Sequence, residues 1–450
     1  MEALIKEIKI DLNAFDIYSL FKEDKTVSIL DSGMDAENLG RYSFIGLNPF
    51  LKFKYENDIC SINDEKFKEK NPFKEIKKLI NKYKIENNTK LPYVAGAMGY
   101  FSYDLGRSIE NLPTMSVEDV KIPDCYFYFY DNGIIVDSLE KKTFITALGV
   151  LDSKQNSIDN IKNVIFKGNK VEYHELKNRN TEFTSNFKKA NYIDTVEKVR
   201  QYIRNGDIYI TNLTQRFFCE TKRKPYDVYK DLRYINPAPF AAFMNIEGFS
   251  IVCSSPERFL KIRDNIVETR PIKGTRPRGK SREEDLKNRQ ELIDSEKDHA
   301  ELLMIVDLER NDLSKVCEPY SVKVKELFEL EEYSTVFHLV STVIGKLKNE
   351  YTSVDCVEAC FPGGSITGAP KIRSMEIIDE LEPTRRNIYT GSIGYFGFDG
   401  NVDFNIVIRT IIMKAGKAYF GVGGGITWES DKESEYDETL DKARALMRVL

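Results

Sequence analysis

The sequence predicts an α+β fold in which large antiparallel β-sheets are sandwiched by helices. Stretches rich in β-branched and aromatic residues recur along the chain, and several are joined by turns short enough to connect only antiparallel neighbours. Segments with apolar residues at helical spacing lie between them. At 450 residues, the chain is long enough for two or three domains or for one large intertwined unit.

Residues 1–150 are predicted to form a strand-rich N-terminal region. Its strand patterns are "TVSILDSG", "RYSFIGLNPFLKFKY" and "CYFYFYDNGIIVDSL", and in the last of these Asn132 and Gly133 are typical of a hairpin turn. Residues 151–188 are polar and rich in Asn and Lys, which indicates a junction. The stretch "NPFKEIKKLINKYKIE" is predicted to be a helix because its apolar residues have helical spacing: Phe73, Ile76, Leu79 and Ile80.

Residues 189–450 are predicted to form the second region. It begins with a helix, "NYIDTVEKVRQYIRNGD", which ends at Gly206, and strand patterns follow at 208–219 and 240–254. The last stretch, "DKESEYDETLDKARALMRVL", is predicted to be a helix whose acidic first turn suits the helix dipole. Tight turns between strands are expected at two places: Asp399-Gly400 and Ala415-Gly416.

Composition narrows the class of protein. The 66 Lys and Arg residues against 71 Asp and Glu residues give a formal net charge of −5, which argues against a nucleic-acid-binding protein. The seven cysteines form no C-x-x-C pair, so we expect buried, reduced thiols in a cytoplasmic protein. The N-terminus lacks the apolar segment of a signal peptide, and no apolar run approaches the ~18 residues of a membrane span.

Gly274 to Ser281 match the pattern G-x-x-x-x-G-K-S, which in a P-loop binds the phosphates of a nucleotide. Ser281 and Glu284 add an S-x-x-E capping box that predicts the start of a helix. Three observations count against a nucleotide site: Pro277 lacks a backbone N–H, the run around Asp307 has helical spacing, and the tight turns predict an antiparallel sheet. A P-loop NTPase is therefore kept only as the alternative from a different class of protein.

Lys273 lies in the same stretch, within a segment predicted to be a strand. Its apolar neighbours indicate partial burial, and Arg270 and Arg276 add two positive charges nearby, so we expect the neutral, nucleophilic amine to be favoured. A solvated lysine at a strand end is the plainer interpretation of one lysine alone. Glu257 in "SSPERFL" is expected on an adjoining strand, where it would place an acid beside the amine.

Two pairs of acidic residues have i, i+3 spacing in segments predicted to be helices: Asp298 with Glu301, and Glu435 with Glu438. This spacing places each pair on one face of its helix. If the two faces meet, their carboxylates form an oxygen-rich site suited to Mg²⁺. Taken singly, each pair is more often a charge cluster at the start of a helix.

Two further features indicate an anionic ligand. Gly423, Gly424 and Gly425 in "VGGGIT" let backbone N–H groups approach an anion. Arg409, in the predicted strand "IVIRT", can bind a carboxylate through two hydrogen bonds. With the acidic pairs, they indicate a small, multiply anionic substrate bridged by Mg²⁺; a non-catalytic binding module would leave Lys273 and the carboxylates unexplained.

Eight ordered motifs give the chain a resemblance to a known family: "SSPERFL", "RPIKGTRPRG", "KDHAELLMIVDLERNDL", "FHLVSTV", "FPGGSITGAPKIRSMEIIDELEP", "YTGSIGYFGFDG", "DFNIVIRT" and "GGGITWESDKESEYDETLDKA". On these motifs the chain is similar to the chorismate-utilising enzymes, strongly over 190–450 and more weakly over 1–150 through "LDSGMDAENLGRYSFIG" and "GAMGYFSYDLGR". The resemblance implies the fold of anthranilate synthase component I, with a chorismate-binding catalytic region at 189–450.

The resemblance also indicates a branch of the family. The motif P-I-K-G-T, with Lys273 as covalent nucleophile, is typical of the aminodeoxychorismate synthase branch, and "FPGGSITGAPK" favours the same branch. Anthranilate synthase component I, the alternative, usually has P-I-A-G-T. In isochorismate-forming relatives a lysine that activates water matches Ile210 of this chain, so that base is missing here.

The reaction that the resemblance implies replaces the C4 hydroxyl of chorismate with an amino group, a step toward 4-aminobenzoate and folate. Lys273 adds at C2 while the hydroxyl leaves from C4 with Glu257 as general acid, and ammonia then attacks C4 and expels the lysine. Glu301 and Glu438, with the other member of each acidic pair directly or through water, hold the Mg²⁺ that binds the ring carboxylate. Residues implied to contact the substrate are Gly274, Thr275, His338, Thr367, Tyr389, Arg409, Gly423, Gly424 and Gly425.

Ammonia needs a source, and the sequence contains no G-x-C-x-G nucleophile elbow. The resemblance therefore implies a separate glutamine amidotransferase subunit as partner. His338, taken alone, equally suits a core histidine. The resemblance also implies a tryptophan site, either a feedback site or a structural remnant, at Ser32, Gly40, Arg41, Tyr42, Pro239, Phe240 and Ala241.

Overall fold

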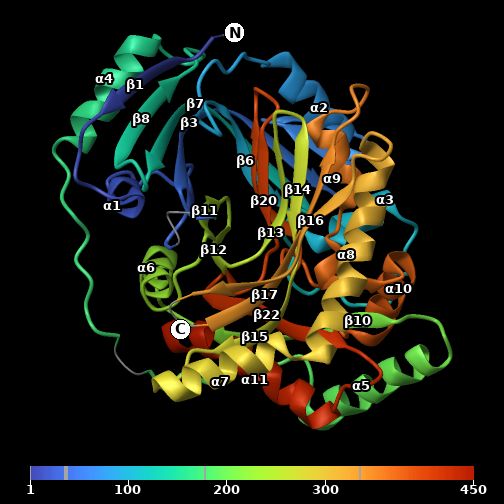
Figure 1. Cartoon of the computed structure of the whole chain (residues 1–450). Helices are drawn as coiled ribbons and strands as arrows, with labels where there is room; N and C mark the ends of the chain where they lie inside the picture. The colour runs from blue at the N-terminus through green and yellow to red at the C-terminus, as the bar shows by residue number, and fades with distance from the viewer. Residues whose placement is uncertain (1, 35–38, 177–178, 334–335) are drawn as a thin grey trace.

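The computed structural model describes residues 2–34, 39–176, 179–333 and 336–450. Within them, 22 strands join into one continuous sheet, and the pairings between these strands are antiparallel (Figure 1). Helices pack around this sheet, which confirms the predicted α+β class. Residues 35–38, within the motif "LDSGMDAENLG", lie outside the described part of the chain.

Most of the sheet can be followed as one path of neighbouring strands. In order of pairing, the path contains β17 (Val336–Lys346), β14 (Ile266–Arg270), β13 (Arg258–Arg263), β20 (Val402–Asn405), β19 (Ser392–Gly397), β6 (Gly96–Phe101), β7 (Cys125–Asp137), β3 (Tyr42–Glu56), β2 (Ser28–Asp31), β11 (Phe240–Ile246), β12 (Phe249–Ser255), β21 (Thr410–Lys414), β22 (Lys417–Ile426) and β10 (Ile210–Glu220). The strands attached to it are β1 (Leu4–Ile8), β4 (Ile59–Ile62), β5 (Glu65–Lys68), β8 (Lys142–Ala147), β9 (Thr184–Ser185), β15 (Ile272–Pro277), β16 (Lys323–Glu332) and β18 (Gly368–Ala369).

The two ends of this path meet again in space. β15 and β16 pair with β17 at one end, and β22 pairs with β10 at the other. Antiparallel strands twist, and a sheet of this many strands curls. The curl brings β15 close to β22, in the lower half of Figure 1, so that the Lys273 side chain lies against Gly425.

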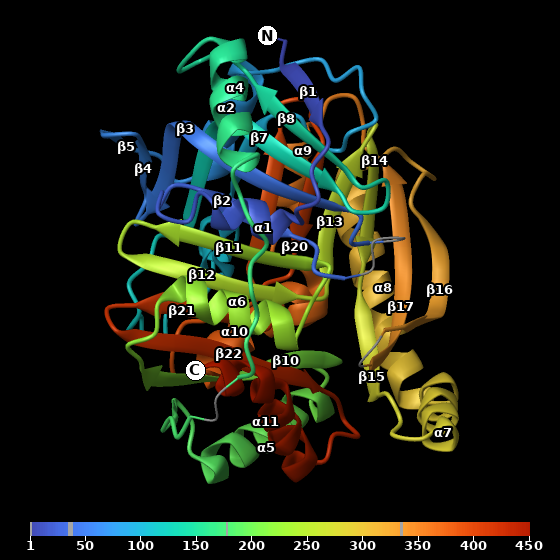
Figure 2. The same ribbon diagram turned by 90° about the vertical axis from the view of Figure 1, so that its left-hand side faces the viewer.

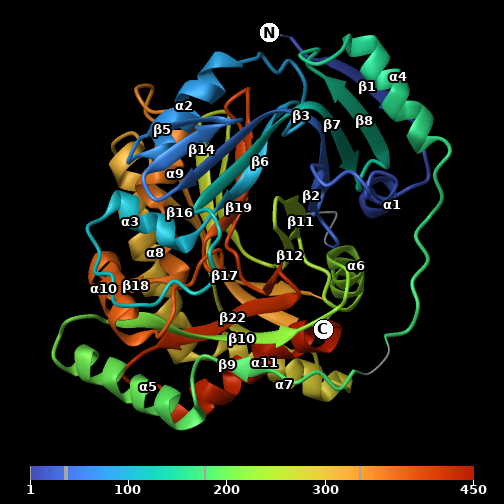
Figure 3. The ribbon, with the colours of Figure 1, turned by 180° about the vertical axis from the view of Figure 1, so that it is seen from behind.

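Helices lie on the outside of the strands. Figure 1 shows α8, α9 and α10 along one side and α5, α7 and α11 below, while Figure 3 shows α1, α4 and α6 on the opposite side. The helices are α1 (Ala14–Ser19), α2 (Pro72–Lys82), α3 (Gly106–Ile109), α4 (Lys154–Ile165), α5 (Lys189–Arg204), α6 (Pro225–Ile235), α7 (Arg282–Ile293), α8 (Glu296–Val316), α9 (Ser353–Cys360), α10 (Lys371–Leu381) and α11 (Lys432–Val449), with two 3₁₀ turns, η1 (Tyr103–Leu105) and η2 (Gly364–Ile366).

Most of the predicted elements are confirmed. α2 buries its four predicted apolar residues, α5 ends just before Gly206, and α11 begins with an acidic first turn. The predicted turns at 399–400 and 415–416 join β19 to β20 and β21 to β22, where Gly400 and Gly416 adopt positive φ values of 92° and 76°.

The predicted hairpin at Asn132-Gly133 is wrong. Both residues lie inside β7, a buried strand of 13 residues that pairs with β3 on one side and β8 on the other. The Asn132 side chain donates to Ser157 Oγ at 3.0 Å, and a Cβ at Gly133 would lie 2.9 Å from Thr146 Oγ1. Close packing and a buried hydrogen bond, not a turn, therefore account for this dipeptide.

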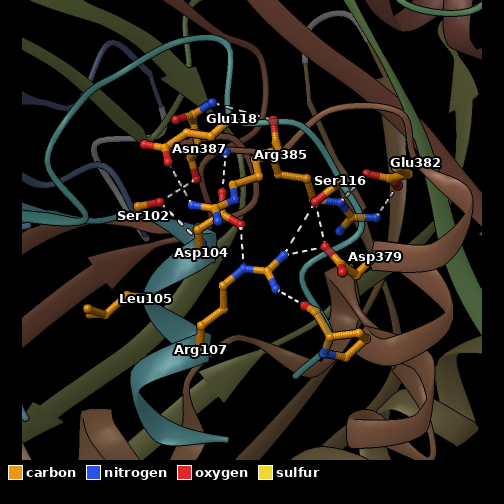
Figure 4. A network of polar contacts seen from close by, with 12 residues as sticks. Ser102, Asp104, Leu105, Arg107, Ser116, Glu118, Asp379, Glu382, Arg385 and Asn387 are labelled. Atoms are coloured by element: carbon orange, nitrogen blue, oxygen red, sulfur yellow. Dashed lines mark hydrogen bonds and ion pairs between the residues drawn. The ribbon is translucent and has the colours of Figure 1, made fainter. Parts of the chain in front are cut away.

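Strands and a polar network join the predicted N-terminal and C-terminal regions. β2 pairs with β11 and β6 pairs with β19. In Figure 4, Arg107 of α3 donates to Asp379 of α10. Asp379 also accepts from Met115 N at 2.7 Å. Asp104 accepts from Asn387 N at 2.8 Å. The boundaries 1–150, 151–188 and 189–450 stay predictions.

The predicted junction contains a helix and an extended connection. α4 packs its apolar face against the sheet, and residues 166–176 then run down the outside of the molecule (Figure 2). All seven cysteines are buried and free, as predicted. Of the helices in the described ranges, none is both long and apolar enough to cross a membrane.

Candidate active site

Lys273 lies where the two ends of the sheet meet. A Cβ added to Gly425 would lie 3.1 Å from Lys273 Nζ and 3.7 Å from Glu301 Oε2, so the amine lies against bare backbone and beside a carboxylate. The next residue, Gly274, has a φ of +77° at an irregularity in the pairing of β15 with β17. Such a bulge redirects a side chain, here the lysine, out of the regular strand pattern.

The two arginines expected to disfavour charge on Lys273 have acidic partners of their own. Arg270 donates to Glu331 at 2.5 Å, and Arg276 donates to Asp298 at 3.0 Å. Each arginine thus has a carboxylate partner of its own. The expected neutral amine of Lys273 stays a prediction, and a nearby carboxylate could accept its proton.

Glu257 is such a carboxylate. It lies between β12 and β13, only 5% of its surface is exposed, and its Oε1 has no hydrogen-bond partner in the described structure. Burial raises the pKa of Glu257, and the Ser365 side chain and the Lys273 charge lower it by less. The prediction that Glu257 lies on a strand adjoining β15 is wrong, because Glu257 lies in the connection between two strands and β15 pairs with β17, but the charge of Lys273 does act on its carboxyl. A buried carboxyl with a free oxygen is suited to hold a proton and donate it.

His338 of β17 and Thr275 of β15 face each other. Thr275 Oγ1 lies 2.8 Å from His338 Nδ1. Burial, and next the positive charge of Arg409, lower the pKa of His338 to about 3. The ring is therefore neutral at physiological pH and can act through hydrogen bonds but not as a cation.

Arg409 is a partly buried cation without an acidic partner among the described residues. The prediction that Arg409 lies in a strand is wrong. It lies in the bend before β21, where its φ is +50°. The bend lets its carbonyl accept from Ser254 N at 3.1 Å. Burial lowers the pKa of Arg409. An unpaired guanidinium of this kind is a binding group for a carboxylate.

Three other predicted positions have distinct surroundings. The Tyr389 ring packs on Gly421, where a Cβ would lie 2.3 Å from the ring. The hydroxyl of Thr367 donates to carbonyls of its own turn, so it stabilises that turn. The Cβ position of Gly425 that lies close to Lys273 Nζ is also 3.2 Å from Ile210 Cδ1. An apolar group therefore flanks the amine.

Gly423, Gly424 and Gly425 form part of β22 and pair with β10, and are not in a loop. Their lack of side chains opens space beside the strand. A Cβ at Gly424 would lie 3.1 Å from Glu435 Oε2 and 3.5 Å from Glu438 Oε1. The glycines therefore let Lys273 and the acidic side chains approach the backbone closely.

The two acidic pairs come together in part. Lys297 Nζ lies 3.8 Å from an oxygen of Glu301 on α8 and 3.8 Å from an oxygen of Glu435 on α11, so the two helices face a common space. Asp298 turns away to Arg276, and Glu438 binds Lys442 at 2.6 Å. Among the residues that the structure describes, no three metal-binding side chains are close enough to form a finished metal site.

The donor set nevertheless fits a divalent cation. Burial is the main reason why the pKa of both Glu301 and Glu435 is raised, and neighbouring carboxylates add to this effect, while nearby lysines oppose it. Oxygen ligands that repel one another beside bare glycine backbone are the surroundings that a bound Mg²⁺ would stabilise. Mg²⁺ at Glu301, Glu438, Asp298 and Glu435 stays a proposal.

The P-loop-like stretch binds its own carboxylates. Gly279 N donates to Asp285 at 2.8 Å, and Lys280 N donates to Glu284 at 2.8 Å. A hydrogen bond from Arg278 is the main reason why the pKa of Asp285 falls to about 2. These N–H groups have anionic partners from α7 already, and the sheet is antiparallel, so a nucleotide site is not supported.

The candidate tryptophan residues surround a different space. A cavity of about 760 Å³ is lined by Ser32, Arg41, Tyr42, Pro239, Phe240 and Ala241 among others. Ser32 Oγ donates to the carbonyls of Tyr42 and Pro239 at 2.8 and 2.9 Å, and Arg41 pairs with Asp137 at 2.7 Å. Gly40, the residue before Arg41, is also buried. Whether the cavity takes tryptophan stays a prediction.

The residues that hold the framework of the site were not predicted. Arg386 and Glu382 form a buried ion pair at 2.7 Å. Arg386 also donates to Asn212 O at 2.7 Å and Ile366 O at 2.9 Å, and Glu382 accepts from Thr214 N at 2.9 Å. The pair thus joins β10 to η2. The i, i+4 spacing of Glu382 and Arg386 is the one sequence signal that could have indicated that they form an ion pair.

Three comparisons with known proteins show what the chain is similar to. A family model described as chorismate binding enzyme matches residues 29–448. Anthranilate synthase component 1 of Acetivibrio thermocellus is 39% identical over 96% of this chain and 92% of its own, and aminodeoxychorismate synthase component 1 of Bacillus subtilis is 41% identical over 91% and 89%. The crystal structure of anthranilate synthase component I from Streptococcus pneumoniae superimposes with a TM-score of 0.81 at 31% identity, covering 91% of this chain and 92% of that one.

Proposed function

The chain belongs to the family of chorismate binding enzymes, and from this premise we propose that it replaces the C4 hydroxyl of chorismate with an amino group, as an aminodeoxychorismate synthase component 1. The observation that carries the proposal is the position of Lys273, half-buried against Gly425 and acting on the Glu257 carboxylate. A lysine beside a buried acid supplies a nucleophile and a proton donor in one place.

One proton transfer prepares both groups. The proton of the Lys273 ammonium moves to Glu257, which leaves a neutral amine and a protonated carboxyl. The amine then forms a bond to C2, the two conjugated double bonds of the ring each move by one position, and the C4–O bond breaks as Glu257 gives its proton to the departing hydroxyl, which leaves as water. Ammonia attacks C4, the two double bonds move back, and the C2–N bond breaks to free Lys273.

The remaining groups bind and orient the dianionic substrate. Arg409, unpaired among the described residues, would bind one carboxylate, and neutral His338 and Thr275 would direct hydrogen bonds to the same space. Ile210 adds an apolar wall that keeps water from the carbon that Lys273 attacks. Mg²⁺ held by Glu301 and Glu438 would supply positive charge for the ring carboxylate.

The nitrogen source is proposed to be a partner protein. The relatives are named component 1, which supports a second component, and we propose that it is a glutamine amidotransferase that supplies ammonia. The alternative function, anthranilate synthase component 1, is supported by the relative at 39% identity. Both reactions begin with chorismate and ammonia, so only the product distinguishes them.

The test is to identify the product. The purified chain is incubated with chorismate, Mg²⁺ and ammonium at a pH where free ammonia is present, and the products are separated by liquid chromatography with mass detection. We expect 4-amino-4-deoxychorismate, with the pyruvyl group retained. Anthranilate formed without an added lyase would favour the alternative, and unchanged chorismate would overturn the proposal.

A further inference from the structure

A lysine, Lys297, lies between the two acidic pairs. It is the second residue of α8, and its Nζ is 3.8 Å from Glu301 Oε1 on the same helix and 3.8 Å from Glu435 Oε1 on α11. Both carboxylates are buried, whereas 45% of the surface of the Lys297 side chain is exposed. The proposed reaction gives this amine no role.

The two oxygens of each carboxylate have different neighbours. The Oε1 atoms of Glu301 and Glu435 face Lys297. The Oε2 atoms face the glycines of β22: Glu435 Oε2 lies 3.1 Å from the Cβ position of Gly424. Glu301 Oε2 lies 3.7 Å from the Cβ position of Gly425. Lys297 therefore leaves one oxygen of each acid directed to the space in which the cation is proposed to bind.

The helix does not account for a lysine at this position. The first turn of a helix carries a partial positive charge, so a cation there is unfavourable. Glu296 and Asp298, on either side of Lys297, are the acidic residues that suit this turn. Lys297 instead pairs with Glu301 and Glu435, whose charges would otherwise repel each other in a buried space.

The contact of Lys297 with the two acids is loose. A separation of 3.8 Å is too long for a hydrogen bond, so the ammonium adds charge but little rigidity. An exposed lysine side chain of this kind can turn into water when another cation takes its place. By contrast, Lys442 is fixed, because it lies 2.6 Å from Glu438 and donates to Gly423 O at 2.8 Å.

We propose that Lys297 is a built-in counter-ion of the acidic pairs: it neutralises Glu301 and Glu435 while no divalent cation is bound, and its charge weakens the binding of that cation. The inference rests on the Mg²⁺ site of the proposed function. Its consequence is that the ion is exchangeable, because the amine offsets part of the charge that would otherwise hold it.

The test is to measure Mg²⁺ binding by the full chain without chorismate. Thermal unfolding is followed while MgCl₂ replaces NaCl at constant ionic strength, and the apparent Kd is obtained from the rise in Tm. In Lys297→Met the carboxylates lose their counter-ion, so Mg²⁺ should bind about tenfold more tightly than to wild type. Lys297→Arg keeps the positive charge, so its Kd should stay within about threefold of wild type.

Two further variants control for charge and for place. Lys287 forms the same i, i+4 contact with Glu291 on α7, at 3.7 Å and with both side chains exposed. Lys287→Met changes the net charge of the chain by the same amount and should leave the Kd for Mg²⁺ unchanged. Glu301→Gln, added to Lys297→Met, removes a proposed ligand and should cancel the tighter binding.

A second readout distinguishes a counter-ion from a structural brace. Without a divalent cation, chemical unfolding should find Lys297→Met less stable than wild type, because two buried carboxylates lose their counter-ion. In saturating Mg²⁺ this difference should disappear, because the ion supplies the missing charge. A structural brace would instead give a loss of stability that persists in Mg²⁺, together with weaker binding of the ion.

Several results would overturn the inference. They are unchanged or weaker Mg²⁺ binding by Lys297→Met, tighter binding that survives Glu301→Gln, equal tightening in Lys287→Met, and no stabilisation by Mg²⁺ of either wild type or Lys297→Met. These measurements do not use chorismate, so the two proposals can fail separately. If wild type consumes no chorismate, the proposed function is wrong. If wild type is active and Lys297→Met binds Mg²⁺ as wild type does, only the role of Lys297 is wrong.

Discussion

Charged side chains around the large cavity are paired with one another, whereas some of those at the candidate active site have no partner. Around the cavity, arginines are matched with carboxylates at short distances: Arg41 with Asp137 at 2.7 Å, Arg258 with Asp403 at 3.0 Å, and Arg233 with Asp31 at 2.5 Å. At the active site, Glu257 Oε1 has no partner and Arg409 has no acidic partner in the described chain.

This difference indicates that the paired charges contribute to the stability of the fold and the unpaired charges contribute to substrate binding. Buried polar groups are nearly always hydrogen-bonded, because an unpaired one is unfavourable in the folded state. Of the paired charges at the cavity, Arg233 with Asp31 joins α6 to β2, two elements that are distant in the sequence. Unpaired charges at the active site keep their binding capacity for a substrate, at the expense of stability. Removing a charge should therefore have opposite consequences in the two regions.

The largest expected effect is that of Glu257→Gln. The variant keeps the shape of the side chain but cannot donate a proton to the departing hydroxyl, so kcat should fall by roughly 10²- to 10⁴-fold with little change in KM. Steady-state kinetics with chorismate and ammonia measures this. A kcat near that of wild type would remove Glu257 from the reaction.

The same variant should not lose stability. The pKa of Glu257 is raised in the folded state, so wild type loses stability relative to the neutral amide as pH rises above the ordinary value of 4.5. Chemical unfolding should therefore find Glu257→Gln at least as stable as wild type at pH 7, with the difference vanishing toward pH 4. A less stable variant at pH 7 would mean that this carboxylate is paired after all.

Arg233→Met tests the opposite region. Asp31 is fully buried and also accepts from Tyr229 at 3.0 Å, so loss of Arg233 leaves a buried carboxylate without its cation. Breaking such a pair destabilises a protein by about 3–5 kcal/mol. Unfolding in urea should show this loss, while kcat of the folded enzyme stays close to that of wild type. A loss of kcat without a loss of stability would contradict the assignment of Arg233 to the stability of the fold.

Arg409→Met should have a smaller effect, confined to binding. A hydrogen bond to a charged group is worth about 1.5–3 kcal/mol, so KM for chorismate should rise roughly 10- to 100-fold. Because the guanidinium lacks an acidic partner among the described residues, the unfolding free energy should not fall. An unchanged KM would show that the substrate carboxylate is bound elsewhere.

The sequence predicted local features well and the meeting of distant strands poorly. The helical spacing of Phe73 and Ile76 and the turn at Gly400 are properties of neighbouring residues, so they could be read directly. Gly133 misled because a glycine needed for packing has the same sequence signal as one needed for a turn.

The site itself depended on motifs. Lys273 and Glu301 were singled out from local patterns and given their roles by the resemblance, but the strand contact through Gly425 depends on how the whole sheet curls, which no local pattern encodes. Arg386 was missed because its burial, and not its residue type, gives it its role. The partners of Arg270 and Arg276 were equally invisible, since Glu331 and Asp298 are distant in sequence.

The most direct test of the account is to trap the bond to Lys273. The enzyme is mixed with chorismate and Mg²⁺ without ammonia, quenched in acid, digested and analysed by mass spectrometry. The account predicts that the peptide containing Lys273 gains the mass of chorismate less one water, and that Lys273→Ala gains nothing and loses most of its amination activity. Full formation of the aminated product by Lys273→Ala would contradict it.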